Sequence, residues 1–292
     1  MFQGEIAALS AAGLWAFATL MFGRLGKQLP PLVLNLVKGA MAIGLIVLTL
    51  AVRQQLLASL PIRSVVLLLV SGVVGIGLGD TAYFATVNAL GARRALLLEM
   101  LAPPMAALMS LIFLQEQLAV VAWVGMALTI GGIVWVVSER SPKAEGTGSP
   151  MGVIFGIMAA LGQSIGSVLS RAALADTVVD PLWSSLLRLS AGLVCIGGLL
   201  LWRRQTVAPN GIRFSSRLLG GVAIAAFFGT YLAIWLQQIA LKHSPAGIAQ
   251  SLLATSPIMV LPMALIIGER VTPRAICGAV VALLGIWLLF SH

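Results

Sequence analysis

Charged side chains are scarce in this sequence of 292 residues. Lys, Arg, Asp and Glu together make up 9% of it, whereas 60% of the residues are apolar. Soluble domains contain roughly 25% charged and roughly 45–50% apolar residues. A soluble protein of this composition could not cover its surface, and the mean hydropathy of +1.05 agrees. The chain is therefore predicted to be an integral membrane protein, which excludes soluble enzymes and disordered scaffolds.

Histidine and cysteine are also rare, with two of each. His243 falls in a predicted loop and His292 is the last residue, so no histidine relay crosses the membrane. Cys195 and Cys277 lie inside apolar runs and are predicted to be small hydrophobic side chains rather than a metal pair. No His-Glu-x-x-His and no Walker sequence occurs. We therefore expect no catalytic residue, no metal, no cofactor and no ATP-driven step. The protein is accordingly not expected to be an enzyme.

The net charge of +9 does not indicate a nucleic-acid partner. Lys and Arg stand singly or in pairs at the ends of apolar runs, with no basic stripe on a polar face. The loops after the odd-numbered spans hold 12 of them, against 4 on the other face: Arg53, Arg63, Arg171 and Lys242. The positive-inside rule places the richer face in the cytoplasm. We expect a multi-pass protein of the inner membrane with both termini outside.

Apolar stretches of about 20 residues, the length that a membrane helix needs, occur ten times. They are 4–22, 31–52, 64–86, 95–115, 119–138, 152–172, 181–202, 218–241, 246–267 and 274–290. Alternating ten-residue strands are absent, so the predicted fold is all-α. Four glycines in the third span, Gly72, Gly75, Gly77 and Gly79, are typical of close helix packing.

The two halves of the chain repeat one another. Pro, Glu, Gly and Gly recur at intervals of 12, 9 and 7 residues, as Pro104, Glu116, Gly125, Gly132 and as Pro257, Glu269, Gly278, Gly285. The predicted units are 1–138 and 152–292, joined by a loop at 139–151. Because each unit has five spans, the second enters the membrane from the opposite side. Inverted repeats of this kind are typical of secondary transporters, with the substrate site near the midplane.

This layout resembles the drug/metabolite transporter superfamily, and in particular its EamA-type exporters. The likeness rests on the duplicated Pro, Glu and Gly…Gly pattern, although the first copy has Gln115 where the second has Gly268. The length and layout are similar to bacterial amino-acid exporters, including those of aromatic amino acids. The resemblance implies efflux of small metabolites by alternating access. It leaves the substrate open among amino acids, nucleotide sugars, sugar phosphates and drugs.

Ionisable residues inside spans are costly and are candidates for substrate binding or coupling. There are four clear ones: Lys38, Asp80, Glu99 and Arg188. At 1.5 Å per residue, Lys38, Asp80 and Glu99 lie about 10, 9 and 6 Å from the same face of the membrane. A pair of Lys38 with Asp80 or with Glu99 is therefore possible. Such a pair is expected to serve proton coupling, or else only to neutralise a structural charge.

Arg188 is the repeat partner of Lys38 and is expected near the opposite face. The positions that correspond to the two acids fall near Trp235 and Gln250, so its half supplies no carboxylate. A guanidinium without an internal partner suits the carboxylate of a substrate. The alternative interpretation is that Lys38 and Arg188 extend toward the interface or bond backbone carbonyls.

Other polar and aromatic residues within spans are candidates for the substrate pocket or for interfacial packing. They are Tyr83, Gln163, Tyr231, Trp235, Gln238 and Gln250. Prolines within the fourth and ninth spans are expected to break those helices near the site or at gating hinges: Pro103, Pro104, Pro257 and Pro262.

The predicted function is secondary transport of small amphipathic metabolites, with amino acids first. The partners are a small-molecule substrate and the lipid bilayer, and a monomer would suffice, although a dimer stays open. The alternatives are transport of other metabolites or drugs, a lipid or lipid-linked-sugar flippase, a passive channel, and an intramembrane enzyme, against which the scarcity of histidine weighs.

Overall fold

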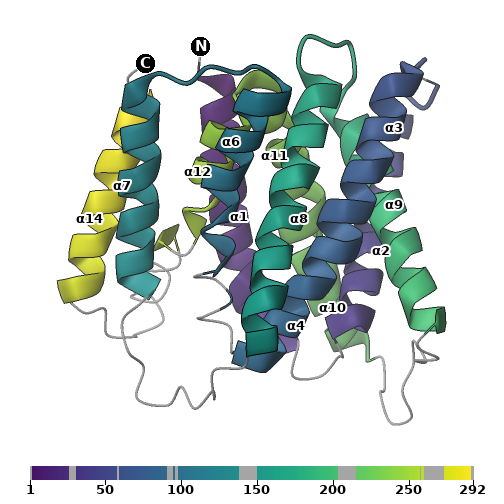
Figure 1. The fold of residues 1–292 in the computed structure, drawn as a ribbon. Coiled ribbons are helices and arrows are strands. Elements are labelled where there is room, and N and C mark those ends of the chain that lie inside the picture. The colour runs from purple at the N-terminus through teal and green to yellow at the C-terminus, as the bar shows by residue number, and fades with distance from the viewer. Residues whose placement is uncertain are drawn as a thin grey trace.

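A computed structural model describes residues 2–25, 31–57, 59–90, 95, 98–137, 150–202, 215–256, 258–259 and 273–290, and every element in these ranges is a helix. The first repeat contains α1 (Gln3–Leu25), α2 (Pro31–Val52), a continuous third span made of α3 (Ile62–Ser71), η1 (Gly72–Gly79) and α4 (Asp80–Leu90), then α6 (Ala102–Phe113) and α7 (Val120–Val137). Figure 1 shows them as an upright bundle.

The second repeat follows the same order. It contains α8 (Pro150–Leu174), α9 (Pro181–Trp202), a continuous span made of α10 (Ser216–Ala226), η2 (Phe227–Leu232) and α11 (Ala233–His243), then α12 (Ala246–Leu253) and α14 (Pro273–Phe290). The all-α prediction of ten spans is confirmed, because every predicted range contains a helix. Five helices are long and apolar enough to cross a membrane within the described residues, and α6, α7 and α14 contain shorter apolar stretches.

Proline and capping residues define where several helices begin. Four of them start on a proline, at Pro31, Pro150, Pro181 and Pro273. Proline is favoured at a first helical position because its missing N–H has no partner there in any case. The start of α9 is also capped, since Asp180 Oδ1 accepts a hydrogen bond of 2.7 Å from the Leu182 N–H.

Contacts between helix ends show that the repeats are inverted. Ser244, after α11, donates to Glu5 near the start of α1. Arg171, near the end of α8, pairs with Glu116, beyond the end of α6. The start of α1 and the end of α8 therefore lie at one end of the bundle, hereafter the upper end, where Figure 1 also shows both termini. Since α1 and α8 open the two repeats, they run in opposite directions.

The two repeat-related central spans share an unusual feature, a π-helical segment in mid-span. It is η1 in the first repeat and η2 in the second, and each is followed at once by an α-helix. A π-helical segment widens the helix locally and leaves carbonyls free for other donors, and such segments often mark functional sites. Accordingly, the Trp15 indole N–H on α1 donates to the Gly229 carbonyl of η2 at 2.9 Å.

The proline-bearing spans are interrupted in both repeats. In the first, a turn at Met100–Leu101 precedes α6, and Pro103 and Pro104 stand in the first turn of that helix rather than in its middle. Proline is tolerated there, so the prediction of a mid-helix break is corrected to a break just before the prolines. In the second, α12 ends at Leu253 and is followed by a turn at Ala254–Thr255, just before Pro257. Pro257 and Pro262 themselves lie outside the described residues.

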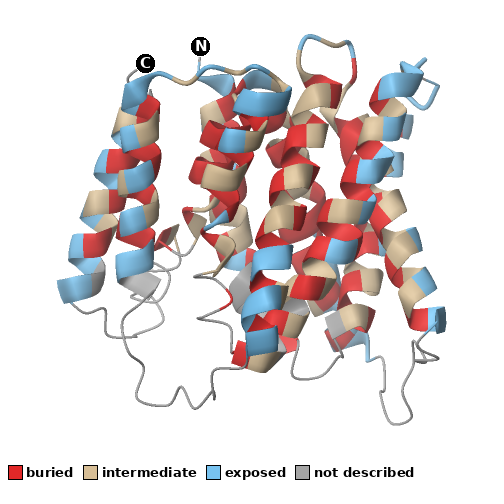
Figure 2. Cartoon of the chain, viewed as in Figure 1, coloured by how far each residue is buried: buried red, intermediate tan, exposed pale blue. Residues whose placement is uncertain are grey.

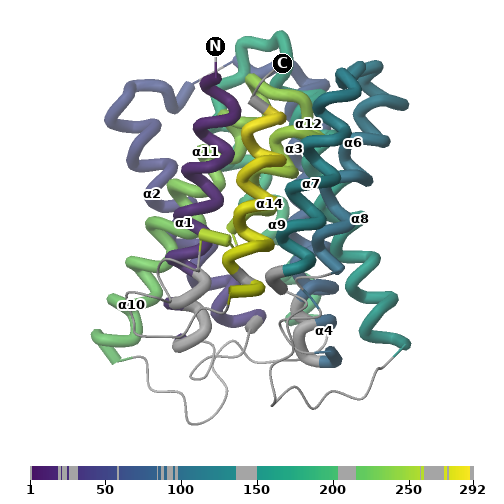
Figure 3. Tube along the Cα trace, turned by 90° about the vertical axis from the view of Figure 1, so that its left-hand side faces the viewer, coloured from purple at the N-terminus to yellow at the C-terminus, as the bar shows by residue number. Residues whose placement is uncertain are grey.

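The Gly…Gly spacing common to both repeats has a structural cause. Helices α7 and α14 lie side by side at one edge of the bundle (Figures 1 and 3). A Cβ on Gly132 would lie 2.5 Å from the Gly278 carbonyl oxygen, and one on Gly285 would lie 2.6 Å from that of Gly125. The four repeated glycines therefore let these two helices approach closely, as small residues do in membranes.

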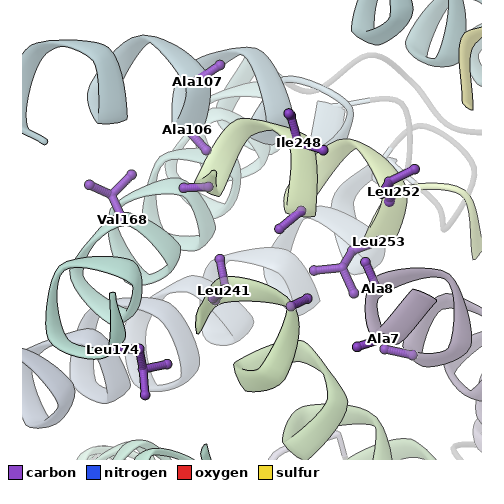
Figure 4. Close-up of a cluster of buried hydrophobic side chains, with 14 of the residues drawn as sticks. Ala7, Ala8, Ala106, Ala107, Val168, Leu174, Leu241, Ile248, Leu252 and Leu253 are labelled. Atoms are coloured by element: carbon purple, nitrogen blue, oxygen red, sulfur yellow. The ribbon is translucent and has the colours of Figure 1, made fainter. Parts of the chain in front are cut away.

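Buried and exposed side chains separate as a membrane protein requires. A core of small and aliphatic residues joins α1, α6, α8, α11 and α12, and Figure 4 shows part of it, including Ala7, Ala107 and Leu252. Large apolar residues such as Val194 and Trp287 are exposed on outward-facing helix surfaces, where Figure 2 shows pale blue. Such a surface is suited to lipid rather than to water.

Candidate substrate site between the repeats

Lys38 and Arg188 occupy equivalent places on inverted helices. Each is the eighth residue of its helix, α2 or α9, which places it about 10 Å in at 1.5 Å per residue. The end of α2 meets the start of α9, because the Trp183 indole donates to the Gln55 carbonyl. Lys38 thus lies about 10 Å from the lower end and Arg188 about 10 Å from the upper end.

Asp80 interacts with both of these cations. It is the first residue of α4, directly after η1, and its carboxyl group interacts electrostatically with both Lys38 and Arg188. Asn35, one turn before Lys38 on α2, interacts with Asp80, although its amide nitrogen has no hydrogen-bond partner within the described part of the chain. One carboxylate of the first repeat is therefore shared by a cation from each repeat.

Glu99 and Tyr83 surround the same carboxyl group. Glu99 interacts electrostatically with Asp80, and Tyr83 interacts with both acids. Of the two predicted partners of Lys38, the structure brings Asp80 to it, and Glu99 joins the group through Asp80. The structure thus brings together Lys38, Asp80, Glu99 and Tyr83, and their function stays a prediction.

Arg188 is 1% exposed and has a neutral partner in its own repeat. Its Nη1 donates to Gln237 Oε1 at 3.4 Å. The prediction that Arg188 lacks an internal partner is therefore corrected: Gln237 contacts it, and Asp80 reaches it from the other repeat. Counting charges within one half could not show a partner supplied by the other half.

The predicted glutamines lie at two helix contacts, one between α9 and α11 and the other between α8 and α12. Gln238, buried on α11, accepts a hydrogen bond of 2.8 Å from Ser184, which precedes Arg188 by one turn of α9. Gln250 on α12 donates to Ser167 on α8, which in turn donates to the main-chain oxygen of Gln163. Gln250 therefore joins α12 to α8.

Tyr231 on η2 and Trp235 on α11 contact residues at the end of α2, in the upper half of the bundle. A hydrogen bond of 2.8 Å joins the Tyr231 hydroxyl to Thr49 Oγ1. The Arg53 guanidinium lies over the Trp235 ring, 5.6 Å from its centroid, and pairs with Asp180 at 3.9 Å. Contact with a charge beyond the end of α2 favours the interfacial interpretation of Trp235 over a central pocket.

Asn35, Ser184 and Gln237 were not among the predicted residues, although a signal for two of them exists. Asn35 precedes Lys38 by three residues, and Ser184 precedes Arg188 by four. Residues at these spacings share a helix face, so each charged residue already indicated its polar neighbour. Among the described residues, no group of three His, Cys, Asp or Glu side chains could hold a metal ion.

An ion pair fastens the upper end across the two repeats. Glu116 Oε1 accepts from Arg171 Nε at 2.6 Å, and Oε2 accepts from the Ala246 N–H at 3.2 Å. Arg171 Nη1 also donates to the carbonyls of Leu241 and Lys242 at 3.1 and 2.6 Å. The Glu116 carboxylate of the first repeat thus binds the end of α8 and the start of α12, and Arg171 joins the end of α11 to the same place.

Glu116→Gln is expected to destabilise the protein by about 2–3 kcal/mol, because hydrogen bonds to a charged group contribute about this much. The melting temperature in detergent should fall by several degrees. The control is Arg53→Gln, which removes an exposed pair with side chains 45% and 33% exposed and should cost less, since surface pairs contribute about 0–1 kcal/mol. Equal losses in the two variants would contradict this role of Glu116.

The fold and the buried charges define a class: a helical membrane transporter of two inverted repeats. The model of the EamA-like transporter family matches residues 2–138 and 150–291, one copy per repeat. The chain belongs to the EamA-like transporter family, which is a family of transporters and not of enzymes.

The structural comparison agrees on the fold. A protein of known crystal structure aligns with a TM-score of 0.81 over 98% of this chain and 96% of its own, at 17% sequence identity. At this identity the likeness shows the fold alone. No curated protein sequence matches the chain.

Proposed function

We propose that this transporter exports small amphipathic metabolites, amino acids foremost and aromatic ones among them, by alternating access at the charged cluster between its repeats. It acts in the inner membrane, with the upper end and both termini outside. A single chain contains both repeats and is sufficient for the transport cycle.

The observation that carries the proposal is the interaction of Asp80 with both Lys38 and Arg188. Charges at this depth are costly and are kept where they serve a substrate or ion pathway. A zwitterionic amino acid supplies one carboxylate and one ammonium group, and the cluster offers a partner of opposite sign for each. The apolar part of the substrate requires apolar walls, which membrane-spanning helices supply in excess.

The geometry also supports an exchange of partners. The two cations come from different repeats and lie near opposite ends, and both acids, Asp80 and Glu99, belong to the first repeat. Movement of one repeat against the other changes the distance from Asp80 to Arg188, because these residues belong to different repeats. Proton coupling is part of the proposal, with Asp80 or Glu99 as the proton carrier.

Counterflow in proteoliposomes tests the function. Vesicles that contain the protein are loaded with unlabelled phenylalanine, and entry of labelled phenylalanine is followed. The proposal expects saturable, transient accumulation above that of protein-free vesicles, with competition by some unlabelled metabolites. Entry that does not saturate would indicate a channel, and no entry for any amino acid would contradict the amino-acid substrate. An imposed pH gradient then tests proton coupling.

A further inference from the structure

Four polar side chains line the contact between α9 and α11. Ser184 and Arg188, four residues apart, share one face of α9, and Gln237 and Gln238 face them from α11. All four are at most 4% exposed. Ser184 Oγ donates to Gln238 Oε1, and Arg188 Nη1 donates to Gln237 Oε1. Both glutamine carbonyl oxygens are therefore engaged with α9.

The same contact leaves N–H donors over. Among the described residues, Gln238 Nε2 and Arg188 Nε are buried and have no hydrogen-bond partner. A buried donor without an acceptor costs free energy, and most buried polar groups in proteins are paired. The donors outnumber the acceptors at this place, so the missing group is an acceptor.

The other edge of the guanidinium carries the unpaired Nε–H and lies next to a glycine. Arg188 Nη1 is engaged with Gln237, which leaves the edge formed by Nε and Nη2. Gly75 of η1 lies beside Nη2, where a Cβ would stand 3.5 Å away. No side chain of that residue fills the space next to this edge. Two parallel N–H groups on such an edge match the two oxygens of a carboxylate.

We infer that the contact between α9 and α11 is the carboxylate subsite, with Arg188 and Gln238 as its donors. This inference rests on the proposed function and narrows it to substrates that carry a carboxylate. The substrate carboxylate takes the place of Asp80 as the counter-ion of Arg188, and Asp80 becomes available to the substrate ammonium group. Gln238 is the specificity-determining residue, because its unpaired N–H group requires an oxygen acceptor.

Three related compounds separate the contributions of the charged groups. Phenylalanine carries both a carboxylate and an ammonium group, phenylacetate only the carboxylate, and phenethylamine only the ammonium. Each is used to compete with labelled phenylalanine in counterflow and to raise the melting temperature of the purified protein. In the wild type, unlabelled phenylalanine should inhibit the entry of labelled phenylalanine far better than phenethylamine does.

The decisive variant is Gln238→Glu, which keeps the acceptor for Ser184 and the side-chain length but replaces the free donor by a negative charge. We expect its affinity for phenylalanine and phenylacetate to fall about tenfold or more, with that for phenethylamine unchanged or higher. Gln238→Met removes the donor without adding charge and should give a smaller loss of the same kind. The control is Gln55→Glu, the same substitution at an exposed position of the upper end.

The outcomes keep this inference apart from the proposed function. If phenethylamine competes as well as phenylalanine, and Gln238→Glu weakens all compounds equally, the carboxylate subsite is wrong while transport stands. If no compound is exchanged, the amino-acid function fails, and the melting temperatures alone test the carboxylate subsite. The subsite stands if phenylacetate stabilises the wild type but not Gln238→Glu. It is wrong if phenylacetate does not stabilise the wild type.

Discussion

Asp80→Asn is expected to abolish counterflow and to lower the melting temperature by about 5–10 °C. The substitution leaves Lys38 and Arg188 without the carboxylate that interacts with both. Removing one partner of a buried charge pair costs about 3–5 kcal/mol, because the remaining charge is left uncompensated. Thermal unfolding in detergent measures the loss of stability, and counterflow measures the loss of transport.

The double variant Lys38→Met with Asp80→Asn separates charge balance from transport. It removes one cation and one anion together, so stability should recover toward that of the wild type, while transport stays lost. Lys38→Met alone should be milder than Asp80→Asn, since Asp80 retains Arg188. If the double variant were as unstable as Asp80→Asn alone, the electrostatic account of the cluster would be wrong.

Gly72→Ala is expected to be the most damaging of the small substitutions. A Cβ at this position would lie 2.2 Å from the Arg188 carbonyl oxygen and 2.8 Å from its Cα. Since these are backbone atoms, α9 must move away from η1. Overpacking of this kind costs about 1–3 kcal/mol, and it displaces the very residue that supplies the guanidinium. Both the melting temperature and the counterflow rate should fall.

Gly198→Ala is the matched control on α9. Nothing lies within 4 Å of a Cβ at that position, and alanine has a higher helix propensity than glycine. Its stability should therefore equal or exceed that of the wild type, with transport retained. A Gly72→Ala variant that behaved like Gly198→Ala would show that α9 and η1 are not held as closely as the structure describes.

The fold was largely predictable because hydropathy and repetition depend on the sequence alone. Ten apolar stretches and a doubled Pro, Glu and Gly…Gly pattern give the spans and their order. The close helix packing predicted for the glycines of the third span is confirmed at Gly72. The π-helical geometry of that span was not predictable, because its glycines are equally compatible with an ordinary α-helix; the segment packs against α8 and α9, which are distant in the chain.

The site was predictable in part. Depth along the helices was enough to narrow the partners of Lys38 to Asp80 and Glu99, because all three positions are counted from the same end. It failed for Arg188, whose counter-ion belongs to the other repeat and whose neutral partner, Gln237, carries no charge to attract notice. For Trp235 the sequence left pocket and interface open, because an aromatic residue within a span suits both; its contact with Arg53, which favours the interface, depends on a residue distant in the chain.

Reagent access to a single cysteine at position 35 tests the central claim most directly. Asn35→Cys, in a chain whose Cys195 and Cys277 are replaced by alanine, places a thiol beside Asp80. Alternating access predicts that a membrane-impermeant thiol reagent labels it from either side, that substrate slows labelling, and that cross-linking the upper end shut stops labelling from that side alone. Gly44→Cys, on the exposed face of α2, should resist this hydrophilic reagent. Labelling from one side only, unchanged by substrate, would contradict a site that the two repeats expose in turn.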